Sequence, residues 1–185
     1  MSSKIDLISN ALILIGDVSI NDLVGNERRK VVARNLYDNI VNNELTKHRW
    51  GFARKKAQLS LLAAVPIGNE WDRAYELPAD MVTLIKLSPR INYQVYGSQV
   101  YCNFNQALYC DYIYTATEDA WPVYFSKMIE YALARDFATS IRDSSSSRAE
   151  MAAEYENASR MARYTDSQQH PQVPIRSQPL IDVRN

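Results

Sequence analysis

Two pairs of neighbouring carboxylates have the spacing best suited to acid–base chemistry: Glu70 with Asp72, and Glu118 with Asp119. Most glycoside hydrolases place two carboxyl groups beside the scissile bond, so the first pair makes a small cell-wall hydrolase the alternative function. Acidic residues are also common at turns and helix starts, where the helix dipole stabilises them. We favour this structural interpretation for both pairs and predict no catalytic residue.

The chain has few other groups that are typical of catalytic or metal sites. Glu44 and His48 lie one helical turn apart, as either an acid–base pair or an ordinary surface pair, and we expect the surface pair. Cys102 and Cys110 flank a predicted turn, so a disulfide across a hairpin is conceivable, but we expect reduced strand residues. His48 and His170 are too few for a zinc site. We therefore predict no metal and no cofactor.

A short basic run, Arg54, Lys55 and Lys56, follows the aromatic residues Trp50 and Phe52. Basic side chains bind the phosphates of DNA and aromatic rings stack on bases, so these three cations are candidate contacts in a DNA channel. The competing interpretation is an aromatic cluster in the core with solvated charges at its border. Both interpretations stay open at this point.

Composition limits the class of protein. The 185 residues are 46% apolar, which suffices for one domain with its own core. Lys plus Arg and Asp plus Glu both number 21, so the formal charge is zero and gives no general attraction to nucleic acid or anionic membranes. No stretch has the length and apolarity of a membrane helix or a signal peptide. We expect a soluble protein that does not interact with membranes.

The spacing of apolar residues predicts four helices, at about 4–15, 26–49, 122–142 and 147–164. The second is the longest. We expect Asn26 to cap its start, and we expect Gly51 to take a left-handed turn after its end. Such a turn would let the neighbouring rings of Trp50 and Phe52 dock on the core.

The ends of the other helices are also marked in the sequence. Ser3 and Asp6 form a capping-box pattern, Gly16 is a stop signal, and Pro122 suits a first helical turn. The last helix is rich in alanine and buries little area, so we expect it to need a neighbouring subunit. Its predicted inward positions are Met151, Tyr155, Ala158 and Met161.

Alternating residues predict strands between about 55 and 117. Gly97 and Ser98 suit a two-residue hairpin turn. Eight of the 12 tyrosines lie between Tyr75 and Tyr124, and tyrosine is favoured at protein interfaces. The predicted fold is α+β and mainly α: residues 1–165 form an antiparallel helical bundle with a small tyrosine-rich antiparallel β insertion.

Residues 166–185 are predicted to be an extended C-terminal arm, because the prolines exclude a helix. The arm carries several aliphatic residues, which suits a segment that orders against a partner. A plain disordered end is the alternative. The residues that we assign to partner binding are Pro171, Val173, Pro174, Ile175, Pro179, Leu180 and Ile181.

The order of motifs over about residues 3–163 resembles the tail tubular protein A, or head-to-tail adaptor, family of short-tailed bacteriophages. No single motif is specific, but their succession along one chain of this length is similar to that family. The motifs are Ser9–Gly16, Ile20–Leu23, His48–Ala53, Tyr75–Asp80, Tyr96–Gly97, Tyr112–Tyr114 and Trp121–Pro122.

The resemblance implies a structural virion protein that is not an enzyme. It implies a ring of about twelve copies between the portal protein and the tail nozzle, tail tubular protein B, in the tail or neck of the virion. Assembly would take place in the host cytoplasm. Double-stranded DNA would pass through the channel without sequence-specific binding. Tyr93, Tyr96 and Tyr101 are the candidate nozzle-facing residues, and the arm would contact the portal or a neighbouring subunit.

Overall fold

The computed structural model describes residues 3–64, 66, 68 and 70–169. The predicted partner-binding residues of the arm and His170 lie outside the described residues. The helices are α1 Lys4–Leu14, α2 Arg28–Thr46, α3 Val123–Ser140 and α4 Ser145–Gln168, with a short 3₁₀ helix at Glu118–Ala120. The strands are β1 Arg54–Gln58, β2 Ser60–Leu61, β3 Arg73–Glu76, β4 Met81–Ser88, β5 Gln94–Tyr96, β6 Gln99–Cys102 and β7 Tyr109–Tyr114.

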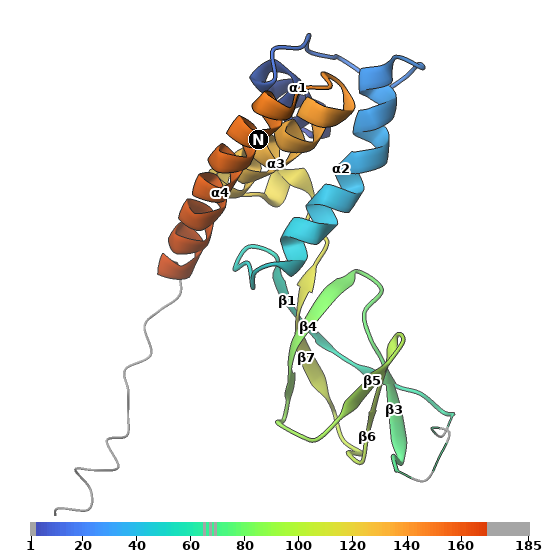
Figure 1. Ribbon diagram of the computed structural model, residues 1–185. Coiled ribbons are helices and arrows are strands. Elements are labelled where there is room, and N and C mark those ends of the chain that lie inside the picture. Colours follow the sequence, from blue (N-terminus) through green and yellow to red (C-terminus); the bar gives the residue numbers. More distant parts are fainter. Residues whose placement is uncertain (1–2, 65, 67, 69, 170–185) are drawn as a thin grey trace, which may run out of the picture.

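The prediction of a helical bundle with a small β insertion is wrong. The chain is an α+β fold in which four helices form one part and seven strands form two antiparallel sheets (Figure 1). Sheet A has the strand order β1-β7-β4, and sheet B has the order β2-β3-β6-β5. The alternating pattern identified single strands, but it does not show that they form two layers around a second core.

The helical part is built around α3, which packs against α4, α1 and α2. Helix α3 is buried on several sides, and its residues Phe125, Met128, Leu133 and Phe137 are fully buried. A helix with so broad an apolar surface is stable only when others cover it. The other three helices therefore fold around α3 as their common partner.

The β part has a core of its own between the two sheets. Sheet B contributes Tyr75 and Val100, and sheet A contributes Leu87, Cys110 and Tyr112. Alternate residues of a strand point to opposite faces, so Asp111 and Ile113 of β7 lie on the other face of sheet A. Ile113 joins the helical core, and it thereby connects the two parts.

Several local predictions are confirmed at helix and hairpin ends. The Ser3 hydroxyl accepts a hydrogen bond from the Asp6 N–H, and Asp6 accepts one from the Ser3 N–H. Gly16 has a φ of 72° after α1. Gly97 has a φ of 56° in the turn that joins β5 to β6.

The predicted ends of α2 are partly wrong. Its N-cap is Glu27 instead of Asn26, and no side chain caps the helix there. Gly51 is not among the glycines with positive φ. Trp50 is nevertheless fully buried and Phe52 packs against the same core, because a loop of seven residues between α2 and β1 turns both rings inward.

Helix α4 differs from its prediction in both length and register. It begins at Ser145 after a Ser144 cap and continues to Gln168, beyond the predicted end. Met161 is exposed and Ala158 is only half-buried. The buried positions are Met151, Tyr155, Ser159, Ala162 and Asp166. Two of these are polar, so a search for apolar residues alone places the inner face incorrectly.

Among the described helices, none is long and apolar enough to span a membrane.

Candidate functional site

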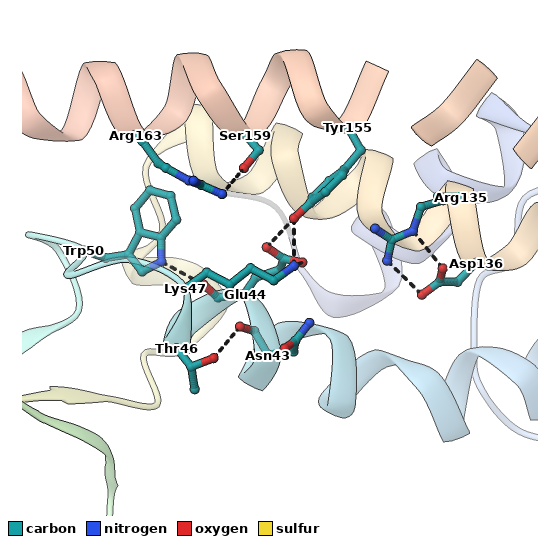
Figure 2. Close-up of polar contacts among 10 residues, drawn as sticks. All are labelled: Asn43, Glu44, Thr46, Lys47, Trp50, Arg135, Asp136, Tyr155, Ser159 and Arg163. Atoms are coloured by element: carbon teal, nitrogen blue, oxygen red, sulfur yellow. Dashed lines mark hydrogen bonds and ion pairs between the residues drawn. The ribbon is translucent and has the colours of Figure 1, made fainter. Parts of the chain in front are cut away.

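A buried polar cluster joins the end of α2 to α4 and α3 (Figure 2). Glu44 is 1% exposed, and its carboxylate accepts hydrogen bonds from Lys47 Nζ at 2.7 Å and from the Tyr155 hydroxyl at 2.8 Å. Lys47 Nζ also donates to Tyr155 Oη at 2.9 Å. The Arg135 guanidinium lies 4.8 Å from the centre of the Tyr155 ring. We call Glu44, Lys47 and Tyr155 the junction triad.

The triad combines a carboxylate, an amine and a phenol, which are groups used in acid–base catalysis. Burial alone would lower the pKa of Lys47, but its hydrogen bonds with Glu44 and Tyr155 outweigh burial and raise that pKa. Burial is also the main reason that the pKa of Tyr155 is raised. Lys47 therefore stays protonated and Tyr155 stays neutral near pH 7. Since Glu44 and Tyr155 are also shielded from solvent, the triad is suited to holding helices together.

Asp166 makes a second connection between α4 and the loop after α2. It is fully buried, and the Gly51 N–H donates to both of its oxygens at 3.1 Å. The Tyr124 hydroxyl donates to Asp166 Oδ1 at 2.8 Å, and His48 Nε2 lies 3.3 Å from Oδ2. A buried carboxylate is tolerated only with such partners. Asp166 thus fixes α4 to the segment His48–Ala53.

The prediction that Glu44 and His48 form a surface pair is wrong. Glu44 is buried and bonds to Lys47 and Tyr155, whereas His48 approaches Asp166. Each of the two side chains has a partner in α4, Tyr155 for Glu44 and Asp166 for His48, more than 100 residues away along the chain. No spacing within α2 predicts either contact.

The two acidic pairs lie in different settings. Glu70 and Asp72 are both exposed, and the Asn103 side chain bonds only to the main chain of this stretch, at Glu70 O and Asp72 N. Glu118 begins the 3₁₀ helix before α3 and accepts a hydrogen bond from the Tyr37 hydroxyl at 2.9 Å. A glycosidase acid must be shielded from water, and the exposed Glu70 and Asp72 lack that shielding.

The two cysteines are free thiols and both are buried. Cys102 belongs to β6 of sheet B and Cys110 to β7 of sheet A, so they do not face each other across one hairpin. Burial raises the pKa of both thiols. Within the described ranges, no group of three or more His, Cys, Asp or Glu residues is placed to hold a metal ion.

The basic run meets other charges on the outer face of sheet A. Antiparallel pairing places Lys56 and Lys86 on either side of Asp111. Arg54 Nη2 donates to Asp111 Oδ2 at 2.9 Å, while Lys86 Nζ lies 3.5 Å from Oδ2 and Lys56 Nζ lies 3.8 Å from Oδ1. Three cations thus share one buried carboxylate. We call Arg54, Lys56, Lys86 and Asp111 the basic face.

Lys55 does not belong to the basic face. It alternates with Arg54 and Lys56 along β1, and its Nζ binds Asp80 Oδ2 at 2.9 Å and lies 3.7 Å from the centre of the Tyr114 ring. The Lys55 bond is the main reason that the pKa of Asp80 is lowered. The structure therefore divides the predicted basic run between two faces and adds Lys86, which lies about 30 residues beyond that run in the sequence.

Replacing Asp111 with asparagine should lower the free energy of unfolding by about 1 kcal/mol at pH 7, because its cationic partners are half exposed and screened. Burial opposes ionisation of Asp111, but Arg54, Lys56 and Lys86 outweigh it and hold its pKa below the ordinary 3.8. The stabilisation is therefore complete above that value and is lost as the pH falls through the lower folded pKa.

The measurement is urea denaturation of the Asp111→Asn variant and the unmodified protein from pH 7 down to pH 3. The difference in stability should shrink below about pH 4. A difference that stays constant across this range would show that the charge of Asp111 contributes nothing.

The predicted nozzle-facing tyrosines lie on the β5–β6 hairpin. Tyr93, just before β5, is 38% exposed, and Tyr96 is 46% exposed. Tyr101 is half-buried, and its ring centre lies 4.9 Å from that of Tyr96. Val95, between the first two, is exposed as well. Strand β5 is at the edge of sheet B, so this hairpin presents a small apolar surface to solvent.

Comparison of the chain with protein-family models gave no match, and comparison with curated protein sequences gave no match either.

Proposed function

We propose that this protein is a structural, non-enzymatic virion component of a short-tailed bacteriophage. It acts as a head-to-tail adaptor in a ring of about twelve copies, between the portal and the tail nozzle, and extends the channel for double-stranded DNA. The order of the sequence motifs supports this family. The exposed and buried residues described above support the structural role independently of the motifs.

The main supporting observation is that the exposed large apolar side chains of the described residues, apart from Leu61 and Tyr109, fall into three groups on different elements. One group is at the end of α1 and in the loop after it, one is on α3 and α4, and one is on the β5–β6 hairpin. A ring subunit needs two different surfaces for its two neighbours, and a connector needs a further surface for an axial partner. The groups are Ile13, Val18 and Val24; Val123, Met161 and Tyr164; and Tyr93, Val95 and Tyr96.

The buried polar groups also fit a connector better than an enzyme. Glu44, Tyr155 and Asp166 are buried, and each is hydrogen-bonded to a side chain or a main-chain group of another element. Such contacts give a fixed orientation to α4 and to the segment that leads into β1. A subunit that transmits position from one ring to the next needs this rigidity.

The predicted arm cannot begin at residue 166, because α4 continues to Gln168. Thr165 lies inside α4, and a truncation after Thr165 would remove Asp166 with its contacts to Gly51 and Tyr124. We therefore place the truncation after Gln169, which is the C-cap of α4.

The test is the particle mass of the purified portal with and without this protein. The full chain should add about twelve subunits of 21.2 kDa to each portal. The chain truncated after Gln169 should stay folded and add none, because multivalent attachment through the arm is lost. If the full chain adds no mass, the connector function is wrong. If the truncated chain adds the same mass, only the role of the arm is wrong.

A further inference from the structure

The cations of the basic face form a short row across sheet A. Lys56, Asp111 and Lys86 are register partners on β1, β7 and β4, so the two lysines stand two strand spacings apart, or about 10 Å. Their side chains are 61% and 57% exposed, whereas that of Asp111 is 8% exposed. The ammonium groups therefore face solvent while the neutralising carboxylate lies beneath them.

A groove extends this row beyond β4. It has a volume of about 550 Å³ and is lined by Lys86, Ser88 and Arg90, by Tyr93, and by the apolar residues Ile85, Leu87 and Ile91. Arg90 is exposed and forms no ion pair with any described residue. Lys86 belongs to both the groove and the basic face, so the groove adjoins the row of cations and places Arg90 beside it.

The surface beside the row of cations is polar on β1 and β4, whereas the groove beyond β4 also has apolar side chains in its lining. Near its outer end this face carries the exposed Tyr109 of β7 and its two register partners, Gln58 on β1 and Ser88 on β4. Interfaces between proteins usually have an apolar centre, whereas interfaces with nucleic acid are more polar and much more positively charged. The basic face, with three cations and one carboxylate, has the positively charged composition of an interface with nucleic acid.

Asp111 gives the row a fixed geometry. It holds Arg54 by a hydrogen bond and attracts both lysines. With three cations and one carboxylate, the face keeps an excess of positive charge although the whole chain is neutral. A positive area on a neutral protein attracts anions locally, as phosphate contacts require.

We propose that the outer face of sheet A, through Arg54, Lys56, Lys86 and Arg90, binds the phosphate backbone of duplex DNA without reading its sequence. The choice of duplex DNA rests on the proposed connector function, in which DNA passes the subunit. Each subunit contacts DNA phosphates through this face of its β part. In a ring, the weak contacts of the single subunits add up.

The experiment is fluorescence anisotropy of a labelled duplex of about 20 base pairs with the full-length protein at about 50 and 200 mM salt. Four phosphate contacts predict that the Kd rises about 100-fold over this range. The variant Lys56→Gln with Lys86→Gln leaves the Arg54–Asp111 bond in place, so it should fold. It should bind at least about 10-fold more weakly at low salt, with a salt slope shallower by about 2.

The matched control is Arg148→Gln with Arg160→Gln, which removes two exposed cations of α4 that form no ion pair with the described part of the chain. It should bind as the unmodified protein does. Equal weakening in the control would overturn the proposal, because binding would then follow total charge. Competition by polyglutamate as effective as that by unlabelled duplex would overturn it as well, since the face would then recognise carboxylates.

The particle mass with portal, measured on the same variants, separates this inference from the proposed function. Normal assembly together with absent DNA binding overturns only the DNA contact. If the protein never assembles on the portal but binds DNA, and the Lys56→Gln and Lys86→Gln changes weaken that binding, the connector function is wrong. The phosphate-binding face then still stands.

Discussion

Replacing Trp50 with alanine should lower the free energy of unfolding by about 3–5 kcal/mol. Trp50 is fully buried where α2, α3 and the start of β1 meet. Its ring centre lies 5.0 Å from that of Phe125 at an interplanar angle of 73°, and 4.8 Å from that of His48. Its Nε1–H donates to the Glu44 carbonyl oxygen at 3.0 Å. Truncation removes the ring and leaves a cavity, and the Glu44 carbonyl keeps only the main-chain bond from the Lys47 N–H, at 3.3 Å.

The measurement is urea denaturation followed by far-ultraviolet circular dichroism, because the change removes a fluorophore. Trp50→Phe is the matched control: it keeps an aromatic ring and loses only the N–H donor and some volume, so it should lose about 1–2 kcal/mol. A loss below about 1 kcal/mol in Trp50→Ala would show that the aromatic cluster does not hold the helical part to β1.

Replacing Asp166 with alanine should lower the free energy of unfolding by about 2–4 kcal/mol. The Gly51 N–H and the Tyr124 hydroxyl would lose their shared acceptor, and His48 would lose its acidic neighbour. These groups belong to two segments, the loop after α2 and the start of α3, and Asp166 joins both of them to the end of α4. The last turns of α4 should therefore detach first.

Glu156→Ala is the matched control, because Glu156 is an exposed acid on the same helix. It should change stability by less than about 0.5 kcal/mol. Hydrogen exchange should show loss of protection in the last two turns of α4 for Asp166→Ala and normal protection for the control. Unchanged exchange there would contradict the assigned role of Asp166.

The sequence determined the local elements of the fold. The Ser3–Asp6 capping box, the Gly16 stop and the Gly97 turn depend on residues a few positions apart, so their physics is present in a short window. The four helices follow from apolar residues at helical spacing, and their ends differ from prediction by a few residues. The burial of Trp50 was also predicted from the sequence, although the expected left-handed turn at Gly51 was wrong.

The division of the strands into two sheets was decided by tertiary structure. The alternating pattern of β7 is the same whether it belongs to one sheet or two. Its position between β1 and β4 places Asp111 beside Lys86, about 25 residues away along the chain, and separates Lys55 from its two basic neighbours. A run of charges in the sequence therefore did not define the charged face.

The composition of the candidate site was also decided by tertiary structure. Glu44 appeared to be a surface residue of a helix and Asp166 the first residue of a polar arm, because ionised side chains are usually exposed. Each is buried only because partners more than 100 residues away, Tyr155 for Glu44 and Gly51 for Asp166, supply hydrogen bonds that offset the loss of water. Local sequence carries helix and turn preferences, but the burial of a charge depends on groups that only the folded chain brings within bonding distance.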